Sequence, residues 1–273
     1  MSGILAIASE SWTRVSASRA VIGFALVFSA LALGLSYFGL AGQRTAGFQG
    51  FARVTGSLIN LVVYLVPLIA LVIGTTEVTG RRDSLALMLA QPVRRRDVLL
   101  GSFLGVGGAL VSALVIGLGG AGVFLAVRTD TASLGGYLVL VGAAVGLVLA
   151  FLAVAFLIGV VLLDRVKAMA AAVIVWFLTV IGYDLVLIGV TAVFRGVPLK
   201  SILIPAVMLN PVDIARVAVT LGAGRGALFG PAGATLVDVF GRAPGAAAAA
   251  TLLLLQIAVP LFIAVRVFRR RDL

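Results

Sequence analysis

Residues 131–163 read TASLGGYLVLVGAAVGLVLAFLAVAFLIGVVLL and carry no charged side chain. A helix that crosses a bilayer needs about 20 mostly apolar residues, so this run is long enough for one crossing. Its apolar residues follow one another without the alternation that is typical of barrel strands, which favours a helix. The run therefore predicts a transmembrane helix near residues 135–163.

Five further runs repeat this pattern. Four of them are uncharged and the fifth contains only Asp184; they cover residues 20–43, 54–76, 98–127, 243–265 and 168–194. The helices predicted from them lie near residues 20–40, 57–76, 99–126, 246–266 and 168–194. The first run is longer than the apolar core of a signal peptide, about 7–15 residues, so we expect it to be retained. The sequence predicts an all-α membrane protein in which residues 1–273 form one domain with six transmembrane helices.

The composition agrees with a membrane protein and excludes several other classes. Hydrophobic residues make up 62% of the chain, charged residues 11%, and the mean hydropathy is +1.23. A soluble domain has about 45–50% apolar and about 25% charged residues. The net charge of +11 suggests nucleic acid as a partner. However, the charges lie at the ends of apolar runs, so we expect a lipid bilayer and no nucleic acid.

Several kinds of chemistry are missing from the sequence. It has no His and no Cys, which excludes zinc sites of the Cys/His type, His-based catalytic triads and disulfides. Its only lysines are Lys167 and Lys200, and neither lies in a P-loop, so the chain does not bind ATP in that way. We therefore expect no catalytic residue, no metal site and no cofactor in this chain, which is not an enzyme.

The distribution of basic residues predicts the orientation. If the N-terminus is cytoplasmic, the inner segments hold thirteen of the 21 Lys and Arg residues. They are Arg14, Arg19, Arg81, Arg82, Arg94, Arg95, Arg96, Arg165, Lys167, Arg266, Arg269, Arg270 and Arg271. Positive residues collect on the cytoplasmic side of membrane proteins. We expect a multi-pass protein of the cell inner membrane with both termini in the cytoplasm.

Two cytoplasmic segments have a helical pattern. Residues 1–18 contain Ile4, Leu5, Ala8, Trp12 and Val15 on one stripe, which predicts an amphipathic helix in the interface; the alternative is a frayed terminus. The loop 77–97 predicts a short helix. Asp83 or Ser84 is its cap, Leu85, Met88 and Leu89 are its apolar face, and Pro92 ends it.

The segment 195–245 is expected outside the cytoplasm, before the last span. Asn210, Pro211 and Asp213 have the order of a cap residue, a first-position proline and a first-turn acid, and Gly222 ends the predicted helix. We expect this segment to lie on the membrane surface or against the tops of the spans. It could also dock an external protein, with Asn210, Asp213 and Arg216 as candidate contacts.

Asp184 is the one ionisable residue well inside a predicted span. An acid at this depth costs about 2.5–3.5 kcal/mol on insertion scales unless it is protonated, paired or in a polar cavity. Asp184 and its neighbour Tyr183 are therefore candidates for a substrate path or a subunit interface. The alternative is a structural hydrogen bond to a neighbouring helix.

The order of these motifs resembles the ABC-2 type permease family. An acid ends the second span at Glu77, a Leu-rich helix follows at Leu85–Leu89, and Pro92-Val93-Arg94 precedes Leu99-Leu100-Gly101. More narrowly, Tyr183-Asp184-Leu185, Leu209-Asn210-Pro211-Val212-Asp213 and the closing Arg269-Arg270-Arg271-Asp272-Leu273 resemble the permeases that support maturation of nitrous oxide reductase.

The resemblance implies an ABC-2, type V exporter-like fold and a set of partners. These are a second copy of the chain, two cytoplasmic ATPase subunits that bind ATP and Mg²⁺, and a periplasmic protein. It implies that the loop 77–97 is a coupling helix that contacts the ATPase through Glu77, Arg81, Arg82, Leu85, Met88, Leu89 and Arg94. The narrower likeness implies a role in supplying a sulfur species for a copper–sulfide enzyme.

The sequence alone leaves three other functions open. One is a general ABC-2 exporter permease for drugs or lipids. Another is a membrane scaffold that transmits mechanical work without moving a solute. The third is a secondary transporter that uses Asp184 as a proton site.

Overall fold

The computed structural model describes residues 3–41, 48–80, 94–128, 134–162, 164–193, 200–222 and 242–270. The helices are α1 (Gly3–Ser16), α2 (Arg19–Ala41), α3 (Phe48–Gly80), α5 (Arg95–Arg128), α6 (Leu134–Leu162), α7 (Arg165–Phe177), η2 (Leu178–Gly182), α8 (Tyr183–Val193), α9 (Lys200–Leu209), α10 (Pro211–Gly222) and α12 (Arg242–Arg270). Five predicted coupling residues, Arg81, Arg82, Leu85, Met88 and Leu89, lie outside the described residues.

The six predicted spans are confirmed. Six helical stretches are long and apolar enough to cross a membrane: Arg19–Gly39, Val54–Gly80, Arg95–Val127, Gly135–Leu162, Arg165–Val190 and Gly245–Arg270. Within the ranges that the structure describes there is no strand. The fold is therefore all-α, as the uncharged runs indicated. The fifth span is made of three pieces, because the π-helical turn η2 separates α7 from α8.

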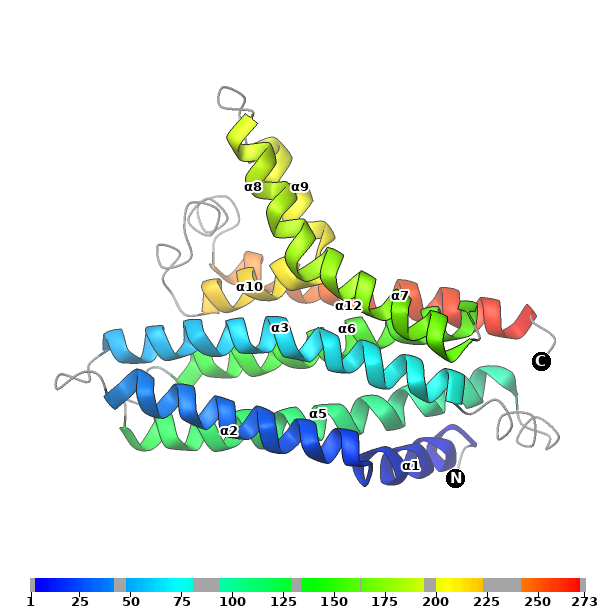
Figure 1. Cartoon of the computed structure of the whole chain (residues 1–273). Coiled ribbons are helices and arrows are strands. Elements are labelled where there is room, and N and C mark those ends of the chain that lie inside the picture. The colour runs from blue at the N-terminus through cyan, green and yellow to red at the C-terminus, as the bar shows by residue number, and fades with distance from the viewer. Residues whose placement is uncertain are drawn as a thin grey trace.

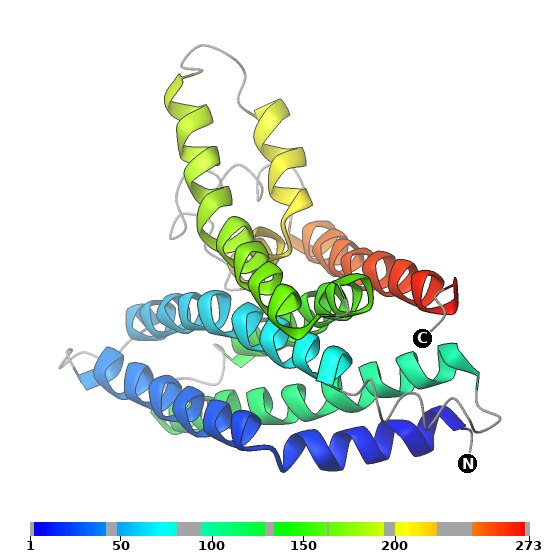
Figure 2. The same cartoon turned by 45° about the vertical axis from the view of Figure 1, so that its right-hand side comes forward.

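The core of the bundle lies between α3 and α6, with α5 and α2 beneath them (Figure 1). In the apolar stretches of α3 and α6, 61% and 56% of residues are buried, against 6% in the fifth span. The α8–α9 pair leans away from the bundle in both views (Figures 1 and 2). Most of the fifth span is therefore available to lipid or to another subunit.

Both termini lie at one end of the molecule, together with the end of α3 and the starts of α5 and α7 (Figures 1 and 2). The basic residues at this end belong to different helices, and among those described are Arg14, Arg94, Arg165, Lys167 and Arg269. We call it the basic end. By the rule that positive residues collect inside, this is the end expected in the cytoplasm.

Helix α1 packs along the first turns of α5, where two glycines leave room for it. A Cβ atom on Gly101 would lie 2.8 Å from the Ile7 Cβ and 2.9 Å from the Ile4 carbonyl oxygen. On Gly105 it would lie 2.6 Å from the Ser11 Cβ and would also meet the Ala8 carbonyl oxygen. These distances are too short for any real side chain, so only glycine permits this close approach.

The buried face of α1 differs slightly from the predicted stripe. Ile7, Ser11 and Val15 are buried, whereas Leu5 and Trp12 are half exposed. The reason is the glycine surface of α5, against which Ile7 and Ser11 make the closest contacts. The large Leu5 and Trp12 side chains flank that contact, where apolar and aromatic side chains of an amphipathic helix meet the membrane interface.

Substituting Gly105 by Leu is expected to detach α1 from α5, because overpacking a tight contact costs about 1–3 kcal/mol. A cysteine introduced at buried Ser11 should then react several-fold faster with a thiol reagent. Gly119→Leu on the same helix is the matched control, because nothing lies within 4 Å of its Cβ position. Equal reactivity of the Ser11→Cys reporter in both variants would contradict this packing.

Candidate functional site

Two polar sites stand out, and the first joins α1 to the end of α3. Arg14 donates hydrogen bonds to both carboxylate oxygens of Glu77, with 2.9 Å between Nη1 and Oε2. Arg14 also lies 3.6 Å from Glu10, one turn before it on α1. The Glu77 side chain is only 10% exposed, and this fork of donors binds both of its carboxylate oxygens. The bond with Glu77 is the main cause that raises the pKa of Arg14 above its ordinary value.

Glu77 lies where several helices meet. It lines a small cavity of about 20 Å³ together with Ser102 of α5, Phe156 of α6 and Phe268 of α12. Glu77 of α3 therefore pairs with α1 and borders a cavity that α5, α6 and α12 also line, and we call this arrangement the Glu77 node. Arg94, the other described coupling candidate, is exposed, and its carbonyl oxygen accepts the first hydrogen bond of α5 from the Asp97 amide at 2.8 Å.

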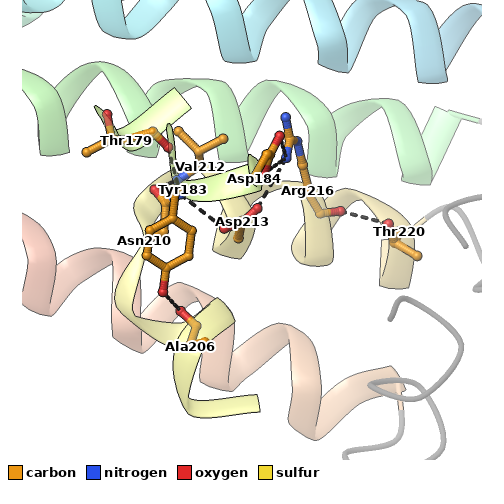
Figure 3. A network of polar contacts seen from close by, with 9 residues as sticks. All are labelled: Thr179, Tyr183, Asp184, Ala206, Asn210, Val212, Asp213, Arg216 and Thr220. Carbon is orange, nitrogen blue, oxygen red and sulfur yellow. Dashed lines mark hydrogen bonds and ion pairs between the residues drawn. The ribbon is translucent and has the colours of Figure 1, made fainter. Parts of the chain in front are cut away.

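The second site is a polar cluster that contains Asp184, Asp213, Arg216 and Asn210 (Figure 3). The Arg216 Nη1 atom lies 2.9 Å from both carboxylate oxygens of Asp184 and 3.2 Å from Asp213 Oδ1. Asn210 donates to Asp213 Oδ2 at 3.0 Å and to the Thr179 carbonyl oxygen at 2.8 Å. Two carboxyl groups thus share one guanidinium.

The cluster fixes a hairpin that enters the bundle. Thr179 and Gln256 lie near the middle of the spans Arg165–Val190 and Gly245–Arg270. The turn between α9 and α10 binds both of them, through the Asn210 amide to Thr179 and through the Gln256 amide to the Leu209 carbonyl at 3.0 Å. Tyr183 donates to the Ala206 carbonyl oxygen and ties α9 to α8. The turn therefore lies level with the middle of two spans, deeper than the surface position we expected.

The predicted helix after Asn210 is confirmed. Asn210 Oδ1 accepts a hydrogen bond from the Val212 amide at 3.1 Å, and α10 runs from Pro211 to Gly222. Its apolar face packs on α6 and α12. Asn210 and Asp213 are buried within the molecule; Asn210 contacts the fifth span directly, and Asp213 is joined to it through Arg216. The structure thus brings the two predicted sets, Tyr183 with Asp184 and Asn210 with Asp213 and Arg216, into one cluster.

The partner of Asp184 could not be identified from the sequence. Arg216 lies 32 positions further on, and the pairing requires α9 to return alongside α8. The three-residue spacing of Asp213 and Arg216 on a helix was the available signal, since side chains so spaced share one face. The π-helical turn Leu178–Gly182 adjoins this site, as such turns often adjoin functional sites.

Comparisons with known proteins decide the family. The sequence model described as ABC-2 family transporter protein matches residues 5–273. The chain belongs to this ABC-2 transporter family. The permease is also similar to two proteins named "Probable ABC transporter permease protein NosY". The one from Stutzerimonas stutzeri is 32% identical over 264 residues, which cover 93% of each chain. The one from Pseudomonas aeruginosa is 31% identical over 205 residues, which cover 73% of this chain and 74% of that protein.

The two polar sites can now be placed in an ABC-2 permease. An ABC-2 permease is a multi-pass membrane subunit of a transporter and not a catalytic enzyme, and its family implies an ATPase partner. The Glu77 node lies at the basic end of this permease, where the described chain leaves α3 toward the predicted coupling loop. The polar cluster lies at mid-span, where charged residues need partners.

Removing the guanidinium from the polar cluster should destabilise the permease more than removing one carboxylate. Arg216→Gln leaves two acids without a cation and should cost about 2–4 kcal/mol. Asp184→Asn leaves a neutral Arg216–Asp213 pair and should cost less. Thermal unfolding in one detergent measures both, with Thr251→Val on α12 as the control outside the cluster. An Arg216→Gln variant as stable as Asp184→Asn would contradict the shared-cation arrangement.

Proposed function

We propose that this chain is the membrane subunit of an ABC transporter in which a second copy and two cytoplasmic ATPase subunits complete the machine. The observation that carries the proposal is the Glu77 node, where a carboxylate with a side chain only 10% exposed joins α1 to α3. Movement imposed on α1 passes to α3 through the Arg14–Glu77 pair and to α5 through the glycine contact, and α6 and α12 pack in turn on these helices or on each other. The basic end is then the cytoplasmic end.

The Glu77 node suits the transmission of movement because its contacts are rigid and join α1 directly to α3. The paired Arg14–Glu77 hydrogen bonds fix orientation as well as distance. The contact of α1 with Gly101 and Gly105 of α5 is tight, so α1 does not slide along α5 without moving it. When an ATPase moves the amphipathic helix α1, the spans therefore move with it, because the side chains between them do not rearrange.

We propose further that the permease serves a NosY-type system, in which it supports maturation of nitrous oxide reductase by moving a sulfur species. The similarity to NosY proteins over most of the chain supports this role. The lack of His and Cys in the sequence favours a sulfur cargo over copper, because soft copper ions are carried by thiolate and imidazole ligands. A protein of the outer compartment would complete such a system.

Breaking the node should uncouple ATP hydrolysis from the permease while assembly persists. Arg14→Gln and Glu77→Gln are each expected to lower permease-stimulated ATPase activity in reconstituted vesicles by roughly tenfold, which corresponds to about 1.4 kcal/mol of lost coupling. The double variant should lose no more than the stronger single variant, because one contact is removed twice. Arg19→Gln, an exposed cation just beyond α1, is the matched control.

Two results would contradict the coupling role. One is full stimulation of the ATPase by both single variants. The other is additive loss in the double variant, which would show that Arg14 and Glu77 act separately. Co-purification of the ATPase with every variant separates uncoupling from failure to assemble.

The NosY-type role is tested in cells that lack their own permease of this kind. Expression of this chain with its ATPase should restore the copper–sulfide centre of nitrous oxide reductase, measured by the absorption of the purified reductase. An ATPase variant unable to hydrolyse ATP should not restore it. A reductase that still lacks the centre, beside an assembled and active permease complex, would exclude this role and favour a general exporter.

A further inference from the structure

The basic end carries an open groove on one side of α12. Phe262, Val265, Arg266, Arg269 and Arg270 line it, and its volume is about 300 Å³. The residues are three or four positions apart, so they share one side of the helix. Ala264 and Phe268, on the other side of α12, are buried in the bundle. The groove therefore opens away from the packed core.

The arginines of this groove lack a counter-ion within the described part of the chain. Elsewhere at this end, Arg14 is paired with Glu77, and Arg96 lies 3.3 Å from Asp97. Arg266, Arg269 and Arg270 are exposed, and no ion pair joins them to any residue described. Three guanidinium groups on adjacent turns repel one another, so an anion between them is stabilised. Guanidinium groups bind phosphate through two parallel hydrogen bonds.

The apolar wall of the groove identifies the kind of anion. Phe262 is 65% exposed and lies one helical turn, about 6 Å, further into the span than Arg266. It lies about 12 Å from Arg270 along the helix, at a depth that acyl chains occupy and that a soluble protein does not reach. A ligand that fills the groove therefore has a phosphate at one end and a hydrocarbon chain at the other.

We propose that this groove binds an anionic phospholipid, with the headgroup phosphate on Arg266 and Arg269 and an acyl chain against Phe262. Basic pockets at the cytoplasmic ends of spans are known to select anionic headgroups. The site is separate from the Glu77 node and from the polar cluster. It needs no ATPase, so its test is independent of the proposed function.

The experiment measures lipid retained by the purified permease. Protein is reconstituted with equal amounts of phosphatidylglycerol and phosphatidylcholine, and bound lipid is counted by native mass spectrometry. The wild type should retain phosphatidylglycerol at least about fivefold over phosphatidylcholine, which corresponds to about 1 kcal/mol. Arg266→Gln/Arg269→Gln should abolish the preference. Arg165→Gln/Lys167→Gln, which removes two exposed cations from α7 at the same end, should keep it.

Two further arms identify the ligand. Phe262→Ala keeps every charge and should lower phosphatidylglycerol retention, because the chain contact is lost. Inorganic phosphate at millimolar concentration should not displace the lipid. The proposal is overturned if the α12 and α7 variants lose the preference equally, or if phosphate alone displaces the lipid. It is also overturned if the α12 variant keeps the lipid and loses the ATPase, which would make the groove a protein contact.

Discussion

Hydrocarbon offers no hydrogen-bond partner to a peptide group, and this constraint shapes the whole permease. Each crossing satisfies its backbone internally as a helix, and almost every charge lies at a helix end. The constraint also explains the exceptions. Asp184 lies inside a span only because Arg216 reaches it from α10, and α10 is fixed there by Asn210. The polar cluster thus fixes the α9–α10 hairpin against the fifth span. Apolar contacts in lipid do not by themselves determine where such a hairpin lies.

Small residues supply the second requirement of a bundle in lipid, which is close approach between helices. Gly101 and Gly105 let the amphipathic helix α1 contact the backbone surface of α5. This contact, together with the Arg14–Glu77 pair, makes α1 part of the bundle's basic end. The segment that the sequence places at the membrane interface therefore also packs on the core of the bundle. The two roles are compatible, because Leu5 and Trp12 remain exposed beside the contact.

The sequence was sufficient for the spans, the helix after Asn210 and the family, because each rests on a local pattern of apolar, capping or charged residues. It was not sufficient for pairings between distant segments. Asp184 and Arg216 looked like separate features, since nothing local shows that α9 turns back into the bundle. The GxxxG spacing at Gly101 and Gly105 is common in a chain with 33 glycines, so only the position of α1 gives it meaning. The π-helical turn Leu178–Gly182 in the fifth span left no recognisable signal in the sequence.

In the function we propose, the basic end and the segment between α3 and α5 face the cytoplasm and meet an ATPase there. The chain has no cysteine, so a single Ser84→Cys substitution gives an unambiguous label. A membrane-impermeant thiol reagent should modify it in inside-out vesicles and leave it untouched in right-side-out vesicles, and bound ATPase should slow the reaction. Labelling from the outer side, or labelling at the same rate with and without bound ATPase, would contradict the account.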